Sequence, residues 1–206
     1  MGFLKGRLTV RRYRVIDPLP DGFRDAFEAG LTEHAFQDHG SASRGEESVG
    51  WVCPDNLLDT DFDLRDRWLF DHYVMVGMRV DKKVLPAKLF RAMIDKRLRD
   101  WCQENGRAHA PASVRTDVRS AIESELLART LPRVQMVPMC WNLAEGWLLF
   151  HSTADGMNDK FRTLFRRTFG LVPEPFTPLD FLSETEEVAE ALSVVGMTDF
   201  GAGGGA

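Results

Sequence analysis

Residues 134–151 read VQMVPMCWNLAEGWLLFH. This stretch decides whether a fold of helices and strands is α+β, with an antiparallel sheet, or α/β, with a parallel one. Its two apolar runs, 134–143 and 146–151, are separated by a short turn that contains Glu145-Gly146. Two apolar runs around a turn of this kind predict a β-hairpin, whose strands are antiparallel. The stretch therefore favours an antiparallel sheet at this point of the chain.

Further strands and helices are predicted on both sides of this hairpin from the spacing of apolar residues. The predicted strands are 3–16, 49–53 and 68–80, and the predicted helices are 18–30, 86–101, 113–129, 155–169 and 176–192. We expect Gly30 to end the first helix and Ser113 to cap the start of the third. Because strands come in pairs between helices, we expect an α+β fold of mostly antiparallel sheets with packed helices.

The composition is that of a soluble globular protein, with 206 residues, of which 44% are hydrophobic and 28% charged. Three widely spaced cysteines argue against a disulfide framework and indicate a reducing compartment. The apolar runs are far shorter than the roughly 18 residues needed to cross a bilayer. No secretory signal is visible at the start. We therefore expect a cytoplasmic protein without a membrane partner.

The charge is distributed unevenly along the chain, although the net charge is −5. Residues 82–133 hold twelve basic and six acidic side chains, whereas residues 171–206 hold seven acidic and no basic ones. A basic surface can therefore exist on a chain that is acidic as a whole.

The basic segment predicts contact with nucleic acid. At 100° per residue, Lys88, Arg91, Lys96 and Arg99 of the 86–101 helix lie opposite its apolar side, and such a stripe can neutralise phosphates. Arg97 falls on the apolar side. Asp95 interrupts the stripe, and a charged exposed face is also ordinary for a surface helix. The candidate DNA-binding residues are Lys82, Lys83, Lys88, Arg91, Lys96, Arg99, Arg115 and Arg119.

Motifs of common enzymes and cofactor sites are absent from the sequence. There is no phosphate loop, no Gly-x-Ser-x-Gly nucleophile elbow and no zinc spacing of His and Cys, so we expect no cofactor. Asp59, Asp61 and Asp63 alternate like the start of a calcium loop, but Leu64 and Phe70 stand where such a loop needs Gly and Glu. We expect a solvated acidic loop there.

The five tryptophans are candidates for stacking on nucleic-acid bases. Each of them lies in an apolar strand or on an apolar helix face, so we expect all five to pack in the core instead. They are Trp51, Trp68, Trp101, Trp141 and Trp147.

Several short motifs, taken in order, are similar to those of one family. They are the strand from Lys5 to Tyr13-Arg14, Gly50-Trp51-Val52-Cys53-Pro54, Lys83-Val84-Leu85-Pro86, Gly106-Arg107, Leu131-Pro132-Arg133 and Trp141. Together they resemble RdgC, the bacterial recombination-associated protein, over residues 1–182. The sequence departs from the family at Val134-Gln135, where the family has Ala-Phe, and the family's C-terminal third has no counterpart here.

The resemblance implies a non-catalytic protein that binds duplex DNA with little sequence preference. It also implies a ring-shaped homodimer and restraint of a RecA-type recombinase, so we expect a location at the nucleoid in the cytoplasm. Without the C-terminal third, closure of the ring is left open. Two alternatives remain: a protein-interaction module that acts on a recombination or phage-related partner without DNA, and a metal-dependent nuclease that uses Asp59, Asp61 and Asp63.

The expected organisation has two parts. Residues 1–182 form an RdgC-like α+β region, divided into a subdomain of 1–80 with 130–182 and a helical segment of 86–130. Residues 183–206 form an acidic helix followed by a flexible Gly/Ala tail.

Overall fold

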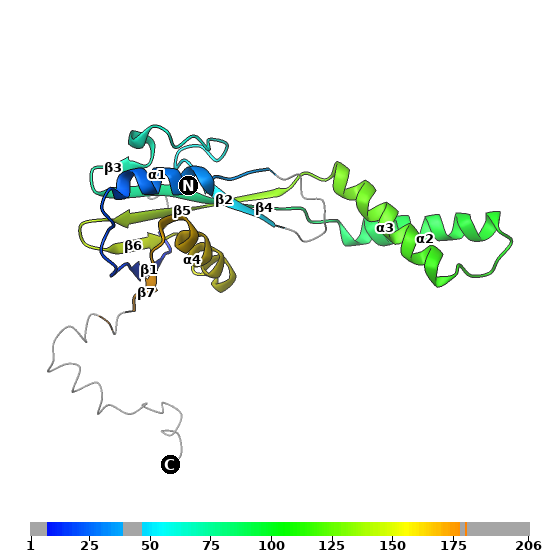
Figure 1. Ribbon diagram of the computed structural model, residues 1–206. Coiled ribbons are helices and arrows are strands. Elements are labelled where there is room, and N and C mark those ends of the chain that lie inside the picture. Colours follow the sequence, from blue (N-terminus) through cyan, green and yellow to red (C-terminus); the bar gives the residue numbers. More distant parts are fainter. Residues whose placement is uncertain (1–7, 39–46, 178–179, 181–206) are drawn as a thin grey trace, which may run out of the picture.

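The computed structural model describes residues 8–38, 47–177 and Asp180, and these form a sheet with a long helical hairpin that projects from it (Figure 1). The strands are β1 (Arg11–Arg14), β2 (Glu47–Val52), β3 (Leu69–Phe70), β4 (Tyr73–Lys82), β5 (Arg133–Asn142), β6 (Trp147–Phe150) and β7 (Glu174–Pro175). The helices are α1 (Phe23–Glu33), α2 (Ala87–Glu104), α3 (Ala112–Arg129) and α4 (Asp155–Phe169), with a short 3₁₀ turn, η1, at Arg65–Arg67.

Seven strands of the described chain form one sheet in the order β2-β4-β5-β6-β1-β7, with β3 paired to β4. All of these strand pairs are antiparallel, which confirms the predicted α+β class. The hairpin of 134–151 is formed by β5 and β6, which pair from Met139↔Phe150 to Trp141↔Leu148. Gly146 completes its turn with φ 74°, a left-handed conformation that glycine adopts without strain.

The two longest strands carry the helical hairpin. β4 and β5 pair over ten residues, from Tyr73↔Asn142 to Lys82↔Arg133. The chain leaves the sheet after Lys82, forms α2 and α3, and returns at Arg133, so that the hairpin extends the line of these two strands (Figure 1). It has its own small core of Leu85, Phe90, Ile122, Leu126 and Leu127.

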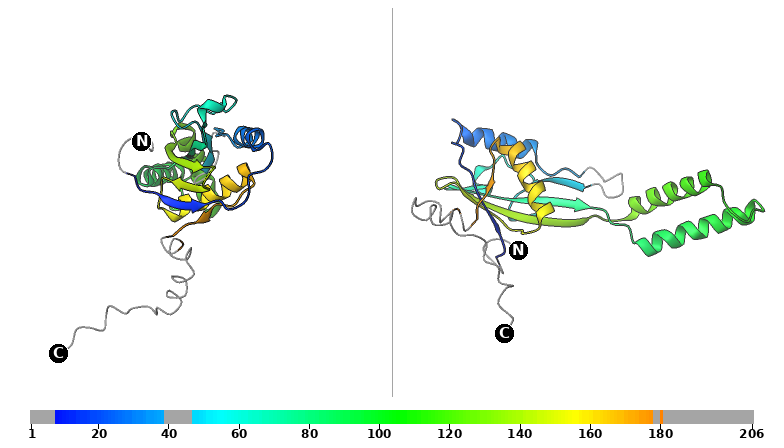
Figure 2. Two further views of the ribbon diagram at one scale, coloured as in Figure 1. Left: turned by 90° about the vertical axis from the view of Figure 1, so that its left-hand side faces the viewer. Right: turned by 90° about the horizontal axis from the view of Figure 1, so that it is seen from below.

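Both helices α1 and α4 lie on one face of the sheet (Figure 2). Aromatic side chains from the helices and the sheet fill the space between them, and Phe161 of α4 stacks on Phe150 at 4.2 Å between ring centroids. Trp51 donates a hydrogen bond from Nε1 to Oγ1 of Thr168 at 2.7 Å, which satisfies its buried N–H. The large buried side chains of this core include Tyr13, Phe27, Trp51, Trp141, Phe161 and Phe165.

The helix α1 does not end near Gly30 as predicted but continues to Glu33. A Cβ on residue 30 would lie 2.2 Å from the carbonyl oxygen of Thr168 in α4. Glycine is therefore present because two helices approach closely, not because a helix ends.

Three other local predictions are wrong in detail. The strand predicted over 68–80 is divided by a turn at Asp71, whose φ is 56°. Ser113 lies inside the first turn of α3, and Pro111 occupies the N-cap position. Phe176 and Thr177 are not helical, and the rest of the helix predicted over 176–192 lies outside the described residues except for Asp180. The acidic helix and tail predicted over 183–206 lie wholly outside them.

The second face of the sheet is partly covered by a loop and partly open. Arg79 points to this face, where its guanidinium donates two hydrogen bonds to Asp81 at 2.9 and 2.6 Å and lies 4.0 Å from the ring centroid of Phe36. Trp147, on β6, is only half-buried on this face of the sheet. Trp101, on α2 of the helical hairpin, is also only half-buried. The prediction of a core position is therefore confirmed for Trp51, Trp68 and Trp141 but wrong for these two.

Candidate nucleic-acid interface

The basic stripe predicted on the 86–101 helix lies on α2, on the side away from the small core of the hairpin. Phe90 is buried in that core, whereas Lys88, Arg91, Lys96 and Arg99 are all exposed. The helix is held in place because Phe90 packs against α3, so the stripe is presented on a supported helix rather than on a loop.

The arginines Arg115 and Arg119 of α3 turn towards α2. The guanidinium of Arg119 lies 5.5 Å from the ring centroid of Phe90. Arg115 lines a groove between the two helices together with Arg99, His109 and Asp95. The sequence placed these two arginines on a separate helix, and the fold brings Arg115 beside Arg99 and Arg119 beside Phe90.

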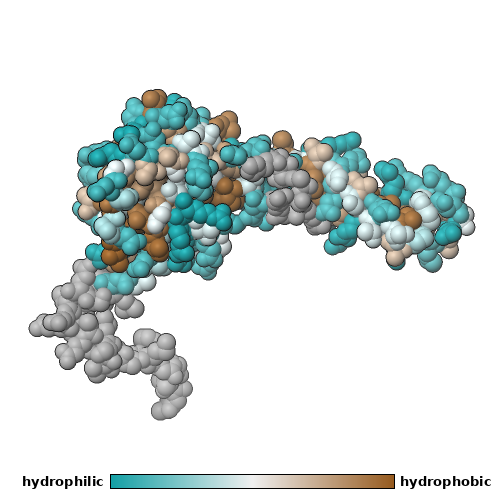
Figure 3. All heavy atoms as spheres, viewed as in Figure 1, coloured by the Kyte–Doolittle hydropathy of each residue, from teal (hydrophilic) through white to brown (hydrophobic). Residues whose placement is uncertain are grey.

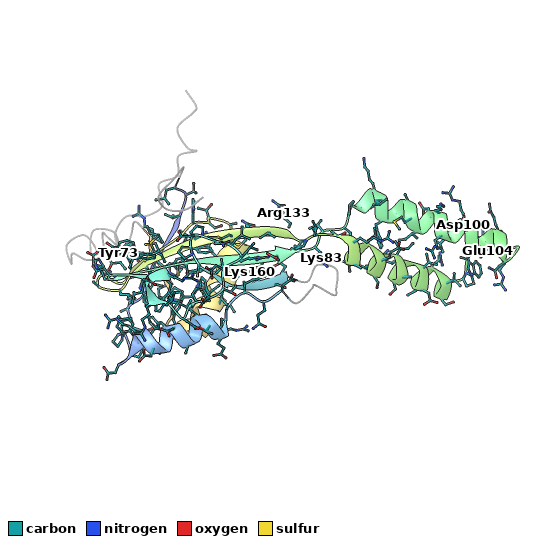
Figure 4. All side chains as sticks on the ribbon, turned by 90° about the horizontal axis from the view of Figure 1, so that it is seen from above. Tyr73, Lys83, Asp100, Glu104, Arg133 and Lys160 are labelled. Atoms are coloured by element: carbon teal, nitrogen blue, oxygen red, sulfur yellow. The ribbon has the colours of Figure 1, made fainter. Side chains whose placement is uncertain are left out.

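A second groove on the hairpin has the opposite charge. Asp100, Glu104 and Asp117 line it with Arg97 around an apolar floor that includes Trp101. At 100° per residue, the α2 residues of the two grooves lie about 160° apart around the helix axis. Asp100 and Glu104 lie near the far end of the hairpin (Figure 4).

The hairpin therefore has two faces of opposite charge. We call the first the basic face, and it is defined by Lys88, Arg91, Arg99 and Arg115 together with Asp95. We call the second the acidic face, and it is defined by Asp100, Glu104, Asp117 and Arg97. Lys96 lies between the two faces on the helical wheel.

The two lysines predicted before the helix are engaged in contacts within the chain. The Nζ of Lys82 donates to Glu47 at 2.8 Å, and Lys160 of α4 pairs with the same carboxylate. These two lysines hold the pKa of Glu47 below its ordinary value, with Lys160 the larger cause. The Nζ of Lys83 donates to the backbone carbonyl of Leu127 at 3.0 Å, which ties the start of the hairpin to its end.

The prediction did not include two basic residues beside this junction. Arg133 is exposed and lies directly opposite Lys82 in the register of β4 on β5. Figure 4 shows it near Lys83, where the hairpin leaves the sheet. Lys160 reaches the same region through Glu47. The register of β4 on β5 brings these groups together, and no local sequence pattern carries that register.

The acidic loop that was considered for metal binding is held by internal contacts. Asp59 and Asp61 lie 3.0 and 3.5 Å from Arg67, and their side chains also accept hydrogen bonds from the backbone two residues further on. Across residues 8–38, 47–177 and 180, no group of three or more His, Cys, Asp or Glu side chains is arranged to hold a metal ion. Burial raises the pKa of the nearby Cys53 thiol to about 11, so this thiol stays protonated at neutral pH.

A family comparison covers most of the chain. The family model described as "Putative exonuclease, RdgC" matches residues 9–193. The chain belongs to the RdgC family. The recombination-associated protein RdgC of Burkholderia cenocepacia is 24% identical over 151 residues, which are 72% of this chain and 46% of that protein. RdgC of Burkholderia ambifaria is 25% identical and RdgC of Ralstonia nicotianae 24% identical over equal shares of both chains.

The chain spans about half the length of these relatives. None of the helices in the described part of the chain has the length and apolar character needed to cross a membrane.

Proposed function

We propose that this RdgC family member binds double-stranded DNA without sequence preference and modulates homologous recombination. The observation that carries the proposal is the separation of charge on the helical hairpin. Arg99 and Arg115 line one groove with Asp95, whereas Asp100, Glu104 and Asp117 line the other groove with Arg97. Binding without sequence preference requires basic groups that reach phosphates, and it requires no side chains that read bases.

The geometry of the basic face supports contact with the DNA backbone. Arginine presents a planar group of N–H donors that matches phosphate oxygens, and three of the four basic residues of this face are arginines. Two of these guanidinium groups, those of Arg99 on α2 and Arg115 on α3, line one groove. In this arrangement several phosphates meet positive charge at once, while the acidic face directs the duplex to one side of the hairpin.

The basic face is tested by a matched pair of variants in a duplex-binding assay. Replacing Arg91, Arg99 and Arg115 by Ala is expected to weaken binding to a random-sequence duplex by at least tenfold at low salt. Replacing Asp100 and Glu104 of the acidic face by Ala is expected to leave binding equal or slightly tighter. Equal loss in both variants would contradict a specific role of the basic face.

The proposal includes the absence of catalysis, although the family description names an exonuclease. Asp59 and Asp61, the carboxylates considered for a nuclease, are paired with Arg67. Incubation of end-labelled duplex with Mg²⁺ or Mn²⁺ tests this part. We expect no release of nucleotides, and cleavage that disappears in Asp61→Ala would establish the nuclease instead.

We further propose that the protein acts as a homodimer at the nucleoid and restrains a RecA-type recombinase by occupying the duplex. Strand exchange by such a recombinase should slow as the protein is added, and the basic-face variant should have lost this effect. If that variant still slows exchange, the protein acts on a partner without DNA, as in the interaction-module alternative.

A further inference from the structure

The open face of the sheet carries a groove of about 560 Å³ that the DNA proposal does not use. The groove runs along β1 and β6 and reaches the chain just after β7. Apolar side chains are at the surface in this part of the body (Figure 3). The groove is lined by Val10, Trp147, Leu149 and Phe176 on its apolar side and by Arg12 and Arg14 on its basic side. Glu145 also lines it and accepts a hydrogen bond from Nε1 of Trp147 at 2.5 Å, so the charged lining residues sum to one net positive charge.

The described chain ends at this groove, and hydrogen bonds fix its direction there. The backbone N–H of Phe176 donates to the carbonyl of Arg12 at 3.0 Å, and the guanidinium of Arg14 lies 5.5 Å from the Phe176 ring centroid. The hydroxyl of Thr177 donates to Asp180 at 2.8 Å, and the Thr177 backbone N–H donates to the same carboxylate. The hydrogen bond from the Thr177 backbone N–H is the main cause of the lowered pKa of Asp180.

The backbone N–H of Asp180 in turn donates to the carbonyl of Thr177 at 3.0 Å, so these two residues close a local turn just after the groove.

The sequence of residues 181–200 is complementary to the groove in both charge and hydropathy. It holds five acidic and no basic side chains. On a helix of 100° per residue, Phe181, Val188, Leu192 and Val195 fall within about 60°, and the glutamates 186, 187 and 190 lie on the other side.

We propose that residues 181–200 of this chain dock on the groove formed by β1, β6 and Phe176. Their apolar stripe covers Val10, Trp147 and Leu149, and their glutamates face Arg12 and Arg14. Attachment through Phe176 gives the segment an effective concentration in the millimolar range, so modest contacts are enough to hold it. A nucleic-acid occupant fits less well, because the floor of the groove is apolar and the carboxylate of Glu145 lines it beside the two arginines.

The proposal is tested by competition with a fluorescein-labelled peptide of residues 181–200 in an anisotropy assay without DNA. The full-length chain should bind the peptide weakly, because its own segment occupies the groove. A full-length variant with Val188→Asp and Leu192→Asp should bind the peptide at least tenfold more tightly. Adding Arg12→Glu to that variant should remove the gain.

Photo-crosslinking identifies the occupant directly. With benzoylphenylalanine in place of Leu149 in the full chain, crosslinks are expected to residues 181–200 of the same molecule. Mixing isotope-labelled and unlabelled chains separates links within one molecule from links between two. Links between two molecules, no links to this segment, or equal peptide binding by the wild type and the double variant would each overturn the proposal. None of these results depends on whether the protein binds DNA.

Discussion

At the scale of single residues, Gly30 lies where α1 packs against α4, the two helices that cover the sheet. A Cβ there would lie 2.2 Å from the backbone oxygen of Thr168, and backbone cannot move aside as a flexible side chain can. Gly30→Ala should therefore lower the free energy of unfolding by about 1–3 kcal/mol, the usual cost of overpacking. Urea unfolding followed by tryptophan fluorescence measures this change.

The matched control is Gly156→Ala, in the first turn of α4. A Cβ at position 156 meets no atom within 4 Å, so this substitution should be neutral or stabilise the protein by up to about 1 kcal/mol. Equal stability of the two variants would show that α1 and α4 are not in the contact described here.

Glu47 gives a second prediction at this scale, which concerns pH. Lys160 and Lys82 lower the pKa of Glu47 in the folded protein below its ordinary 4.5. The carboxylate therefore stabilises the fold above pH 4.5, and this contribution is lost as the pH falls through the lowered value. Glu47→Gln should be less stable than the wild type at pH 7, and the difference should shrink as the pH falls below 4.5. Urea midpoints at a series of pH values measure it, and a constant difference would contradict the ion-pair explanation.

At the scale of elements, each basic residue on the hairpin of α2 and α3 that contacts a phosphate should add separately to the salt dependence of DNA binding. Each phosphate contact that is lost reduces the slope of log affinity against log salt by about 0.9 on duplex DNA. Arg99→Ala, in the basic groove, should reduce the slope by about that amount. Lys96→Ala removes the same charge between the two faces and is expected to change the slope less. The salt dependence of anisotropy with a labelled duplex compares the two.

Elements with strong local signals were predictable from the sequence. The prediction of Asp155–Phe169 for α4 matches its observed bounds, because its apolar spacing ends at Gly170, which adopts φ 69°. The division of 68–80 was missed because the turn uses Asp71 in a left-handed conformation rather than glycine. Gly30 was misread because its reason lies in Thr168, which is distant in sequence.

The candidate site was predictable in its composition but not in its arrangement. Helical spacing grouped Lys88, Arg91, Lys96 and Arg99 on one side of α2. Only the packing of α3 on α2 brings Arg115 beside Arg99 and places Arg119 over Phe90. Lys82 and Lys83 were predicted to face DNA, whereas in the fold they contact Glu47 and Leu127.

At the scale of the whole molecule, the buried aromatic core and the basic face lie in different parts, the core at the sheet and the basic face on the helical hairpin. The aromatic core between the sheet and the helices α1 and α4 stabilises the body, and the hairpin carries the basic face away from it (Figure 1). Because the chain as a whole carries a net charge of −5, which repels DNA, we expect it to bind DNA only through the basic face of the hairpin. Fragments of duplex DNA should therefore protect the amides of α2 and α3 from hydrogen exchange more than those of β2 and α1.

The most direct test of the DNA-binding proposal is affinity for a labelled duplex of random sequence across a salt series, with the mass in solution measured in parallel. We predict binding by a dimer that weakens steeply with log salt and does not depend on the sequence of the duplex. Absence of binding even at low salt would contradict the proposal and leave a protein partner as the target of this RdgC family member.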